Sequence, residues 1–343
     1  MTADPGLPFR ETAHFLRDTM GAKLLASALR KGIIDRLITG PLSEAELRRR
    51  FGIAPAGASL LIAGLQRAEV IDQQGSALRL SQRFGHMLQW LDLLWVKLEF
   101  ASLVQADFTE LTSELLGTGE EFMAKSQTFE LFRYDRAKHR SVENRAATER
   151  WVRWLSVLSR YEAAGLLRLL EQAGARRILD LGGNSGALAH AICAEWGDCE
   201  AQVFDLPVVC DIGRKMHAAH QSAQAVSFVE GDLRGDPLPL GADLILFKSV
   251  LHDWPDRDIA AFLEKAASSL APHGRIAIFE RMPFNFAERM PGFVDLPNLM
   301  FMHALRPPAL YQTMLSKLGL EIVQQTSIEL DMPFALTVAR KSA

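Results

Sequence analysis

The pattern of hydrophobic and polar positions differs between the two halves of the chain. In the second half, short apolar runs alternate with segments that have helical spacing. Five of these runs have the length and composition of buried strands: residues 178–181, 201–205, 225–229, 242–247 and 275–279. Strands that alternate with helices predict a parallel sheet covered on both faces. Two further runs, at 320–329 and 334–339 with a turn at 331–333, predict an antiparallel hairpin at the edge of this sheet.

The first third of the chain has helical spacing instead. Apolar residues recur at this spacing from Leu24 to Ile38, and a second helix begins after Ser43, with a glutamate three residues later that completes a capping box. A third helix is predicted over 58–69, followed by a hairpin over 70–81 with its turn at Gln74-Gly75. Helices followed by such a hairpin predict a winged-helix arrangement.

Winged helices often bind DNA, but the third helix lacks the charge for that function. Arg67 is its single basic residue among small and apolar groups, whereas phosphate contacts need several Lys or Arg. The formal net charge of -3 also gives no general attraction to nucleic acid. We therefore expect this part to pack or to dimerise, and a cofactor-sensing DNA-binding regulator is a minor alternative.

The stretch from His86 to about Leu170 is predicted to be almost entirely helical. Its aromatic residues recur at helical spacing, which is typical of a core, although an aromatic pocket between domains is also compatible with them. The chain is predicted to divide into a winged-helix-like domain over 1–110, connecting helices over 111–165, and an α/β domain over 166–343.

Composition places the chain among globular proteins. Its 343 residues, 48% of them hydrophobic, can bury the cores of two domains, and no apolar run is long enough to span a bilayer. Residues 1–6 lack a basic region followed by an apolar core, so we expect a cytoplasmic location. Three cysteines without a C-x-x-C pair are expected to be buried thiols: Cys193, Cys199 and Cys210. His217 and His220 lack a third ligand nearby, so no metal site is predicted.

A glycine-rich turn follows the first predicted strand, in the segment Asp180-Leu-Gly-Gly-Asn-Ser-Gly186. Gly182, Gly183 and Gly186 permit a sharp turn and close approach of a ligand, and a helix starts directly after them. This arrangement favours a nucleotide-like cofactor, although a turn without a ligand has the same pattern. A dinucleotide fingerprint would require a glycine at position 184, where this chain has Asn184, a residue that tolerates a positive φ.

Polar residues follow the other predicted strands. Asp205 ends the second strand about 20 residues beyond the glycine turn, where a carboxylate can bind both ribose hydroxyls; it can equally begin the turn into the next helix. Because ligands of parallel sheets bind at the carboxyl ends of the strands, we expect Gly182, Asp205, Asp232, Lys248 and Glu280 to meet at one edge.

Two motifs resemble those of a known family. The glycine turn resembles the D/E-x-G-x-G-x-G loop of class I S-adenosylmethionine-dependent methyltransferases, with Asn184 in place of the middle glycine. The segment Lys248-Ser-Val-Leu-His-Asp-Trp-Pro-Asp256 resembles the K-x-x-x-H-D-W-S/P-D motif of the plant-type small-molecule O-methyltransferases, a family that includes caffeate and hydroxyindole O-methyltransferases and bacterial relatives. The resemblance implies a Rossmann-like, doubly wound α/β fold with an antiparallel last strand. It also implies that residues 1–110 form an all-helical, winged-helix-like dimerisation domain that makes a homodimer. Residues 111–165 would contribute to the substrate pocket, and residues 166–343 would form the catalytic domain that binds S-adenosylmethionine.

The resemblance implies S-adenosyl-L-methionine as cofactor and S-adenosyl-L-homocysteine as product. Asp205 would bind the ribose, Asp232 the adenine amino group, and Trp254 would lie beside the adenine. The complete set of implied cofactor residues is Asp180, Gly182, Gly183, Gly186, Asp205, Leu206, Asp232, Leu233, Lys248 and Trp254.

His252 is the implied general base, and Glu280 its implied orienting partner. A histidine with a pKa of about 6.5 suits removal of a phenolic proton during methyl transfer, and its other ring nitrogen then needs an acceptor. The alternatives are a structural histidine at a helix start and a Glu280 paired with Arg281 or Arg275. A second glutamate usual in plant members is missing, because this chain has Leu305-Arg306-Pro307 there.

The segment 293–303 resembles the acceptor-binding helix of the family, and four of its residues are candidates to face the acceptor: Asp295, Asn298, Met302 and His303. Its methionines suit an adaptable pocket and a core equally well. The sequence thus predicts an O-methyltransferase acting on a hydroxyl of an aromatic or polyene small molecule. The alternative is a relative that binds the cofactor but hydroxylates or decarboxylates a polyketide.

Overall fold

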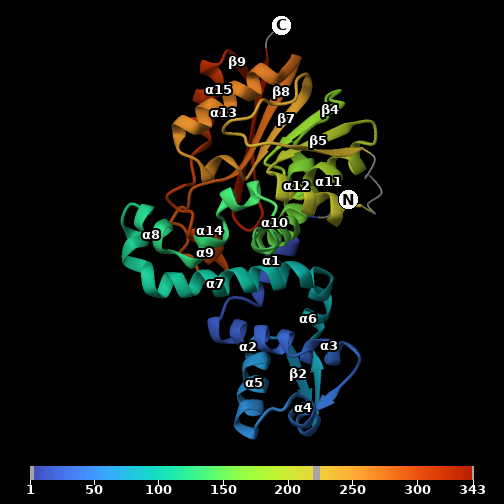
Figure 1. Cartoon of the computed structure of the whole chain (residues 1–343). Coiled ribbons are helices and arrows are strands. Elements are labelled where there is room, and N and C mark those ends of the chain that lie inside the picture. The colour runs from blue at the N-terminus through green and yellow to red at the C-terminus, as the bar shows by residue number, and fades with distance from the viewer. Residues whose placement is uncertain (1–3, 219–224, 342–343) are drawn as a thin grey trace. The chain divides into compact units, whose positions relative to one another are not determined.

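The computed structural model describes residues 4–218 and 225–341, and the chain divides into two compact units (Figure 1). The helical unit comprises Leu7–Leu115 and Phe286–Met300. The sheet unit comprises Leu116–Asn285, Phe301–Ala343 and the chain start up to Gly6. The division therefore keeps residues 116–165 with the sheet and assigns 286–300 to the helical unit.

The helical unit contains mostly short helices and one small sheet. Its elements are α1 (Leu7–His14), α2 (Thr19–Arg30), α3 (Ile33–Ile38), β1 (Leu42–Ser43), α4 (Glu44–Phe51), α5 (Pro55–Arg67), β2 (Ile71–Gln74), β3 (Ala77–Leu80), α6 (Gln82–Met87), η1 (Leu88–Trp90), α7 (Leu91–Leu116), η4 (Phe293–Asp295) and α14 (Leu296–Leu299). The three strands lie in the order β1-β3-β2.

Local sequence explains most of these elements. The capping box of α4 forms as predicted, since Ser43 Oγ accepts from the backbone N–H of Glu46 while the Glu46 side chain accepts from Ser43 N–H. The predicted hairpin is confirmed, with Gly75 at a φ of 61° in its turn. The single helix predicted from Leu24 to Ile38 is wrong, because Gly32 adopts a left-handed φ of 72° and separates α2 from α3.

The sheet unit alternates strands and helices after a helical beginning. Its elements are α8 (Glu120–Lys125), α9 (Gln127–Leu131), η2 (Tyr134–Lys138), α10 (Val142–Leu169), β4 (Arg177–Leu181), α11 (Ala187–Trp196), β5 (Glu200–Asp205), α12 (Pro207–Met216), β6 (Val226–Glu230), β7 (Ala242–Lys248), η3 (Leu251–Asp253), α13 (Asp256–Ser269), β8 (Leu270–Arg281), α15 (Pro308–Lys317), β9 (Leu320–Glu329) and β10 (Pro333–Lys341). The predicted helical stretch up to Leu170 consists of several helices, because new helices begin after the N-cap residues Gly119, Ser126 and Ser141.

The seven-stranded sheet has the order β6-β5-β4-β7-β8-β10-β9. Strands β4 to β8 pair in parallel, whereas β10 runs antiparallel to both β8 and β9. The strand order reverses at β4, which creates the topological switch point where doubly wound sheets bind ligands. The predicted fold class, a doubly wound α/β sheet with an antiparallel last strand, is confirmed.

Helices pack against the sheet in two groups (Figure 1). α10, α11 and α12 pack together, with α11 and α12 against β5 and β6, while α13 and α15 lie against β8, β9 and β10. The three cysteines are free, buried thiols. His220 lies outside the described residues, and no described group of three His, Cys, Asp or Glu side chains is arranged to hold a metal ion. Across residues 4–218 and 225–341, every helix is too short or too polar to cross a membrane.

Candidate active site

The carboxyl edge of the parallel strands collects the five positions that the sequence predicts there. Gly182 follows β4, Asp205 ends β5, Asp232 follows β6, Lys248 ends β7, and Glu280 is the penultimate residue of β8. Parallel pairing in register brings these ends together, because every strand from β4 to β8 points the same way.

The glycine turn adopts the conformation expected from its residues. Gly182 and Gly186 have φ values of 65° and 81°, and Asn184 has a φ of 56°. Asn184 N–H donates to Asp205 Oδ2 at 2.8 Å, and its own side-chain oxygen accepts from Ser185 N–H at 2.6 Å. The prediction that Asn184 keeps the turn through a positive φ is confirmed, and the turn is tied directly to Asp205.

The inner side of this turn is crowded by the side chains of Asp180, Val203 and Val250. A Cβ added to Gly183 would lie 2.5 Å from Asp180 Oδ2, and one added to Gly182 would lie 2.9 Å from Val250. Asp180 is buried, and its Oδ2 has no hydrogen-bond partner among the described residues. Burial raises the pKa of Asp180 to about 7, so a cationic group bound at this turn would stabilise its charged form.

Asp205 is held by two backbone donors. Besides Asn184 N–H, the N–H of Leu206, the N-cap residue of α12, donates to Oδ1 at 2.7 Å. Burial raises the pKa of Asp205 to about 6. Because a carboxylate has about four acceptor sites, Asp205 can still accept from two hydroxyl groups. Both interpretations of Asp205 from the sequence, helix start and ligand carboxylate, are therefore compatible with its contacts.

Asp232 is paired with two cations of the chain itself. It lies 2.7 Å from Lys138 Nζ and 2.9 Å from Arg234 Nε, and the Arg234 guanidinium lies over the Trp254 ring. Burial opposes ionisation, but hydrogen bonds from Arg234 and Lys138 lower the pKa of Asp232 to about 2. Leu233 packs against the core of the sheet. No sequence signal pointed to Lys138, which lies far from Asp232 along the chain.

Lys248 is bound to helix α10. Its Nζ donates to Ser159 Oγ at 2.9 Å and forms an ion pair with the buried Glu162. Glu162 also pairs with Arg281, the residue after Glu280. The positive charge of Lys248 is therefore balanced by Glu162 within the protein. Its contact with a cofactor stays a prediction.

His252 and Glu280 are in direct contact. Glu280 Oε2 lies 2.8 Å from His252 Nδ1, while Oε1 accepts from the backbone N–H groups of Val250 and Leu251, each at 2.8 Å. The alternative pairing of Glu280 with Arg281 or Arg275 is not formed, because Arg281 pairs with Glu162 and Asp331, and Arg275 donates to backbone carbonyls. Glu280 therefore fixes both the imidazole and the loop that carries it.

Two further residues approach this histidine. Asp253 Oδ1 lies 3.5 Å from His252 Nε2, and Tyr134 donates its hydroxyl to Asp253 Oδ2 at 2.7 Å. Burial opposes protonation of His252, but Asp253 and Glu280 together raise the pKa of His252 above its usual value. Asp253 was adjacent to the predicted base and could have been considered, whereas no sequence signal pointed to Tyr134.

Aromatic rings surround the same place. Phe301 packs edge-on against His252 with ring centroids 5.4 Å apart, and Phe129 packs against Phe301 at 5.3 Å. Tyr134 stacks on Trp254 at 6.3 Å and contacts Trp151 edge-on at 5.5 Å. These side chains come from η2, α9, α10 and the segments after η3 and α14, so packing of the sheet unit assembles an aromatic surface beside His252.

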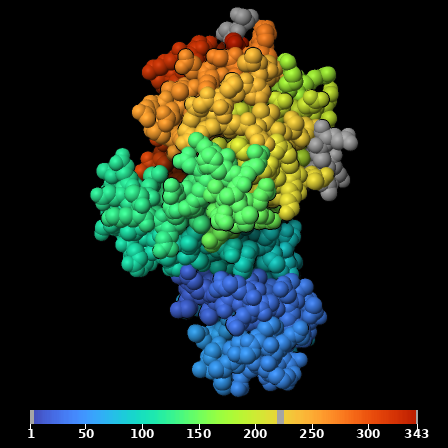
Figure 2. Space-filling view, viewed as in Figure 1, coloured from blue at the N-terminus to red at the C-terminus, as the bar shows by residue number. Residues whose placement is uncertain are grey.

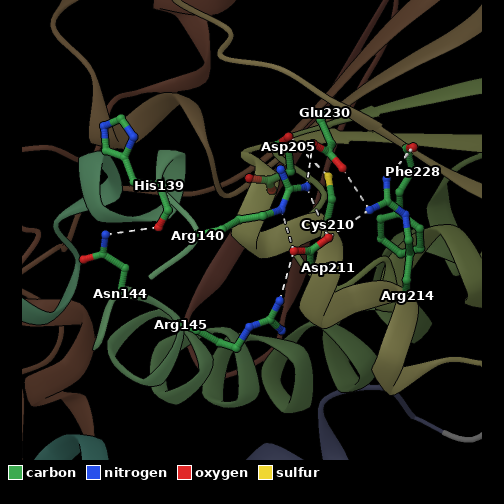
Figure 3. A network of polar contacts seen from close by, with 10 residues as sticks. All are labelled: His139, Arg140, Asn144, Arg145, Asp205, Cys210, Asp211, Arg214, Phe228 and Glu230. Carbon is green, nitrogen blue, oxygen red and sulfur yellow. Dashed lines mark hydrogen bonds and ion pairs between the residues drawn. The ribbon is translucent and has the colours of Figure 1, made fainter. Parts of the chain in front are cut away.

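An ion-pair network attaches the segment carrying Tyr134 to the sheet (Figure 3). Asp211 of α12 lies 2.8 Å from Arg140 and 3.0 Å from Arg145, and Glu230 at the end of β6 lies 2.7 Å from Arg140 and 3.0 Å from Arg214. In the space-filling view this green segment lies at the surface against the yellow part of the sheet unit (Figure 2). The network holds the start of α10 next to α12 and the end of β6.

The four predicted acceptor residues are divided between the units. Asp295 is buried in the helical unit, where it pairs with Arg289 and accepts from Gly292 N–H at 2.8 Å, and Asn298 is also buried there. Met302 and His303 belong to the sheet unit; His303 is exposed and packs against Gly119. Their role toward an acceptor stays a prediction.

The position of the missing second glutamate has no carboxylate. Leu305 is buried, and Arg306 donates to Asp256 Oδ1 at 2.6 Å and to the backbone carbonyl of Trp254 at 3.1 Å. Arg306 thus fixes the end of the loop that carries His252.

Comparison with known proteins identifies the family. Residues 118–319, more than half of the chain, match the O-methyltransferase domain. The chain is 32% identical over 140 residues to demethylspheroidene O-methyltransferase of Rhodobacter capsulatus, covering 41% of this chain and 34% of that protein. It is 25% identical over 256 residues to 3-hydroxy-5-methyl-1-naphthoate 3-O-methyltransferase of Streptomyces sahachiroi. This match covers 75% of this chain and 72% of that protein. The structure of human N-acetylserotonin methyltransferase in complex with SAM superimposes with a TM-score of 0.75 at 21% identity, over 94% of each chain.

The chain therefore belongs to the S-adenosylmethionine-dependent O-methyltransferase family, and the family and cofactor predicted from the sequence are confirmed. It spans about a third of the length of the first relative named above, 34%. The site fits the cofactor, because S-adenosylmethionine carries a sulfonium and an ammonium group, and Oδ2 of the buried Asp180 beside the glycine turn has no hydrogen-bond partner among the described residues.

Proposed function

We propose that this protein transfers the methyl group of S-adenosylmethionine to a hydroxyl of an aromatic or polyene small molecule, with His252 as general base and Glu280 as its orienting partner. The observation that carries the proposal is the 2.8 Å contact between His252 Nδ1 and Glu280 Oε2 at the ligand-binding edge of the sheet. Because a carboxylate only accepts hydrogen bonds, it favours the tautomer with hydrogen on Nδ1 and leaves Nε2 as the base.

The chemistry needs little more from the protein. Bound S-adenosylmethionine supplies a methyl group that is already activated by the sulfonium. The residues of this chain have to align the acceptor oxygen and take its proton, and a phenol with a pKa near 10 is mostly protonated at neutral pH. A histidine whose pKa is raised above its usual value takes that proton more readily.

The glycine turn and the strand ends are proposed to hold the cofactor. Asp180 would face its cationic end, and Asp205 would accept from the ribose hydroxyls. The residues proposed for cofactor binding are Asp180, Gly182, Gly183, Gly186, Asp205, Leu206, Asp232, Leu233, Lys248 and Trp254. For Asp232, binding an adenine amino group would require it to share its carboxylate with Arg234 and Lys138.

The aromatic side chains beside His252 support a flat, unsaturated acceptor. Phe301 packs against the imidazole, Phe129 packs against Phe301, and Tyr134 packs against Trp151 and Trp254. Such rings favour stacking and edge contacts with conjugated molecules. The relatives named for naphthoate and spheroidene substrates agree with an aromatic or polyene acceptor for this chain. Asp295, Asn298, Met302 and His303 are proposed to complete the acceptor site.

The deciding experiment incubates the protein with methyl-labelled S-adenosylmethionine and a panel of phenols, flavonoids, anthracyclines and hydroxylated polyenes. The expected result is a labelled methyl group bound to an oxygen of at least one acceptor as a methyl ether, identified by mass spectrometry. Tight cofactor binding without label in any acceptor would contradict the proposal. It would favour the second candidate, a non-methylating enzyme, for which the absence of a carboxylate at Leu305-Arg306 is the supporting observation.

We also propose a homodimer formed through the helical unit. Support comes from apolar side chains that this unit exposes, among them Met20 at 59% and Leu60 at 55% of their surface. Light scattering at several concentrations tests the assembly, and a monomer at all of them would contradict it.

A further inference from the structure

Asp253 differs from Glu280 in the side of the imidazole that it faces. Glu280 contacts Nδ1, whereas Asp253 Oδ1 lies 3.5 Å from Nε2, the nitrogen proposed to take the proton. That distance exceeds a hydrogen bond, as expected for an Nε2 without hydrogen, but it is short enough for an ion pair once Nε2 is protonated. Both side chains are mostly buried, with 10% of His252 and 17% of Asp253 exposed.

Tyr134 holds this carboxylate in place. Its hydroxyl donates to Asp253 Oδ2 at 2.7 Å, which leaves Oδ1 on the side of His252. Tyr134 is itself fixed between Trp151 and Trp254. Burial and the neighbouring Asp253 raise the pKa of Tyr134 well above its ordinary value, so the phenol keeps its hydrogen and stays a donor.

The charged groups that act on His252 are few. Asp253 comes from η3, and Glu280 and Arg281 come from β8; the two carboxylates favour the imidazolium, and Arg281 opposes it. Arg281 is neutralised by its own ion pairs with Glu162 and Asp331. No carboxylate stands at Leu305-Arg306, so Asp253 is the second acidic group next to this histidine.

We propose that Asp253, held by Tyr134, is the second carboxylate partner of His252 and balances the positive charge that the imidazole acquires during the reaction. The inference rests on the proposed function for its catalytic consequence. In that reaction the acceptor oxygen forms a bond to the methyl carbon, the carbon–sulfur bond breaks with its electron pair going to sulfur, and the hydroxyl proton moves to His252 Nε2. Asp253 and Tyr134 are positioning residues, because they act through His252.

The test compares Asp253→Asn, Tyr134→Phe and a control, Asp198→Asn, which removes an equal charge from a side chain that is 77% exposed and paired with Arg176. Titration of the His252 ring by nitrogen-15 NMR, assigned by loss of its signals in His252→Gln, is measured in the cofactor-free protein. Loss of a nearby negative charge makes protonation harder, so His252 should titrate at lower pH in Asp253→Asn and unchanged in Asp198→Asn. Tyr134→Phe should show a smaller shift in the same direction.

The second readout is the pH profile of methyl transfer. Transfer requires neutral His252, so the rate falls as pH decreases through the pKa of His252, and in Asp253→Asn this acid limb should move to lower pH. The plateau value of kcat should fall about tenfold, because the imidazolium loses a stabilising charge. In Asp198→Asn the profile should not change.

The outcomes separate the two proposals. An unchanged titration of His252 in both Asp253→Asn and Tyr134→Phe would overturn the inference, even if methyl transfer is observed. A shifted titration in a protein that methylates no acceptor would support the pairing and contradict the proposed function instead. If Asp253→Asn fails to fold, Tyr134→Phe alone decides, since it keeps the ring and removes one hydroxyl.

Discussion

The proposed cofactor side and the proposed acceptor side of this site are built in different ways. The cofactor side consists of the turn from Asp180 to Gly186 and of Asp205, where backbone conformation and backbone hydrogen bonds define the shape. The acceptor side consists of His252 with Phe301, Tyr134 and other rings, where side chains from separate elements define it. A short motif can specify the first, whereas only packing of the whole unit assembles the second.

The comparison explains why the two sides tolerate change differently. Around the glycine turn, even one added carbon meets a neighbour, as at Gly183, where a Cβ would lie 2.5 Å from Asp180. On the proposed acceptor side, we expect one aromatic ring to replace another with modest loss, so that acceptor specificity changes without loss of cofactor binding. Substitutions that separate binding from transfer therefore test the difference most directly.

The largest effect is expected from His252→Gln. Removing the base should lower kcat for methyl transfer by about 1,000-fold while the Kd for S-adenosylmethionine changes little, because no contact of His252 belongs to the glycine turn. Single-turnover transfer and calorimetric titration measure the two quantities separately. Retained turnover would contradict the assignment of the base, and a parallel loss of cofactor affinity would show that the two sides are not independent.

Glu280→Gln is expected to have the next largest effect. The glutamine oxygen can still accept from Val250 and Leu251, so the loop should stay folded, but its NH2 group would donate to His252 Nδ1 and place the hydrogen on Nε2. The wrong tautomer should lower kcat by about 100-fold. Glu280→Ala, which also loses the loop contacts, should reduce the melting temperature as well. A fully active Glu280→Gln enzyme would refute the orienting role.

Gly183→Ala addresses the cofactor side. Its Cβ meets Asp180 Oδ2, so the turn or the carboxylate has to shift, and the Kd for S-adenosylmethionine should rise by about tenfold, equivalent to about 1.4 kcal/mol. The matched control is Gly235→Ala, where an added Cβ has no neighbour within 4 Å. Calorimetric titration of both variants makes the comparison. Equal affinities would mean that close backbone approach is not what the turn provides.

The smallest effect is expected from Arg140→Met. This side chain is 48% exposed and joins Asp211 and Glu230, and exposed ion pairs contribute about 0.2–1 kcal/mol each. Thermal unfolding should show a slight loss of stability, and kcat should change less than about threefold. A large loss of kcat would indicate that the segment from Tyr134 to Arg140 has to be held rigidly for the acceptor side to form.

Local sequence predicted the parts of the molecule that depend on neighbours along the chain. Short-range rules explain the strands, the capping box at Ser43, the hairpin at Gly75 and the turn at Asn184. They also explain why the helix predicted from Leu24 to Ile38 is divided at Gly32, because glycine readily takes a left-handed conformation. Family resemblance then pointed to His252 and Glu280, whose contact the structure contains.

Tertiary structure alone decided the side-chain partners that lie far apart in sequence. Tyr134 reaches Asp253 across 119 residues, and Lys138 pairs with Asp232. Lys248, predicted only as a cofactor residue, is paired with Glu162 of α10. Backbone conformation is limited by adjacent residues, and parallel strands bring their ends to one edge whatever their side chains. A long-range ion pair or hydrogen bond instead depends on how whole helices pack, which no short segment of the sequence determines.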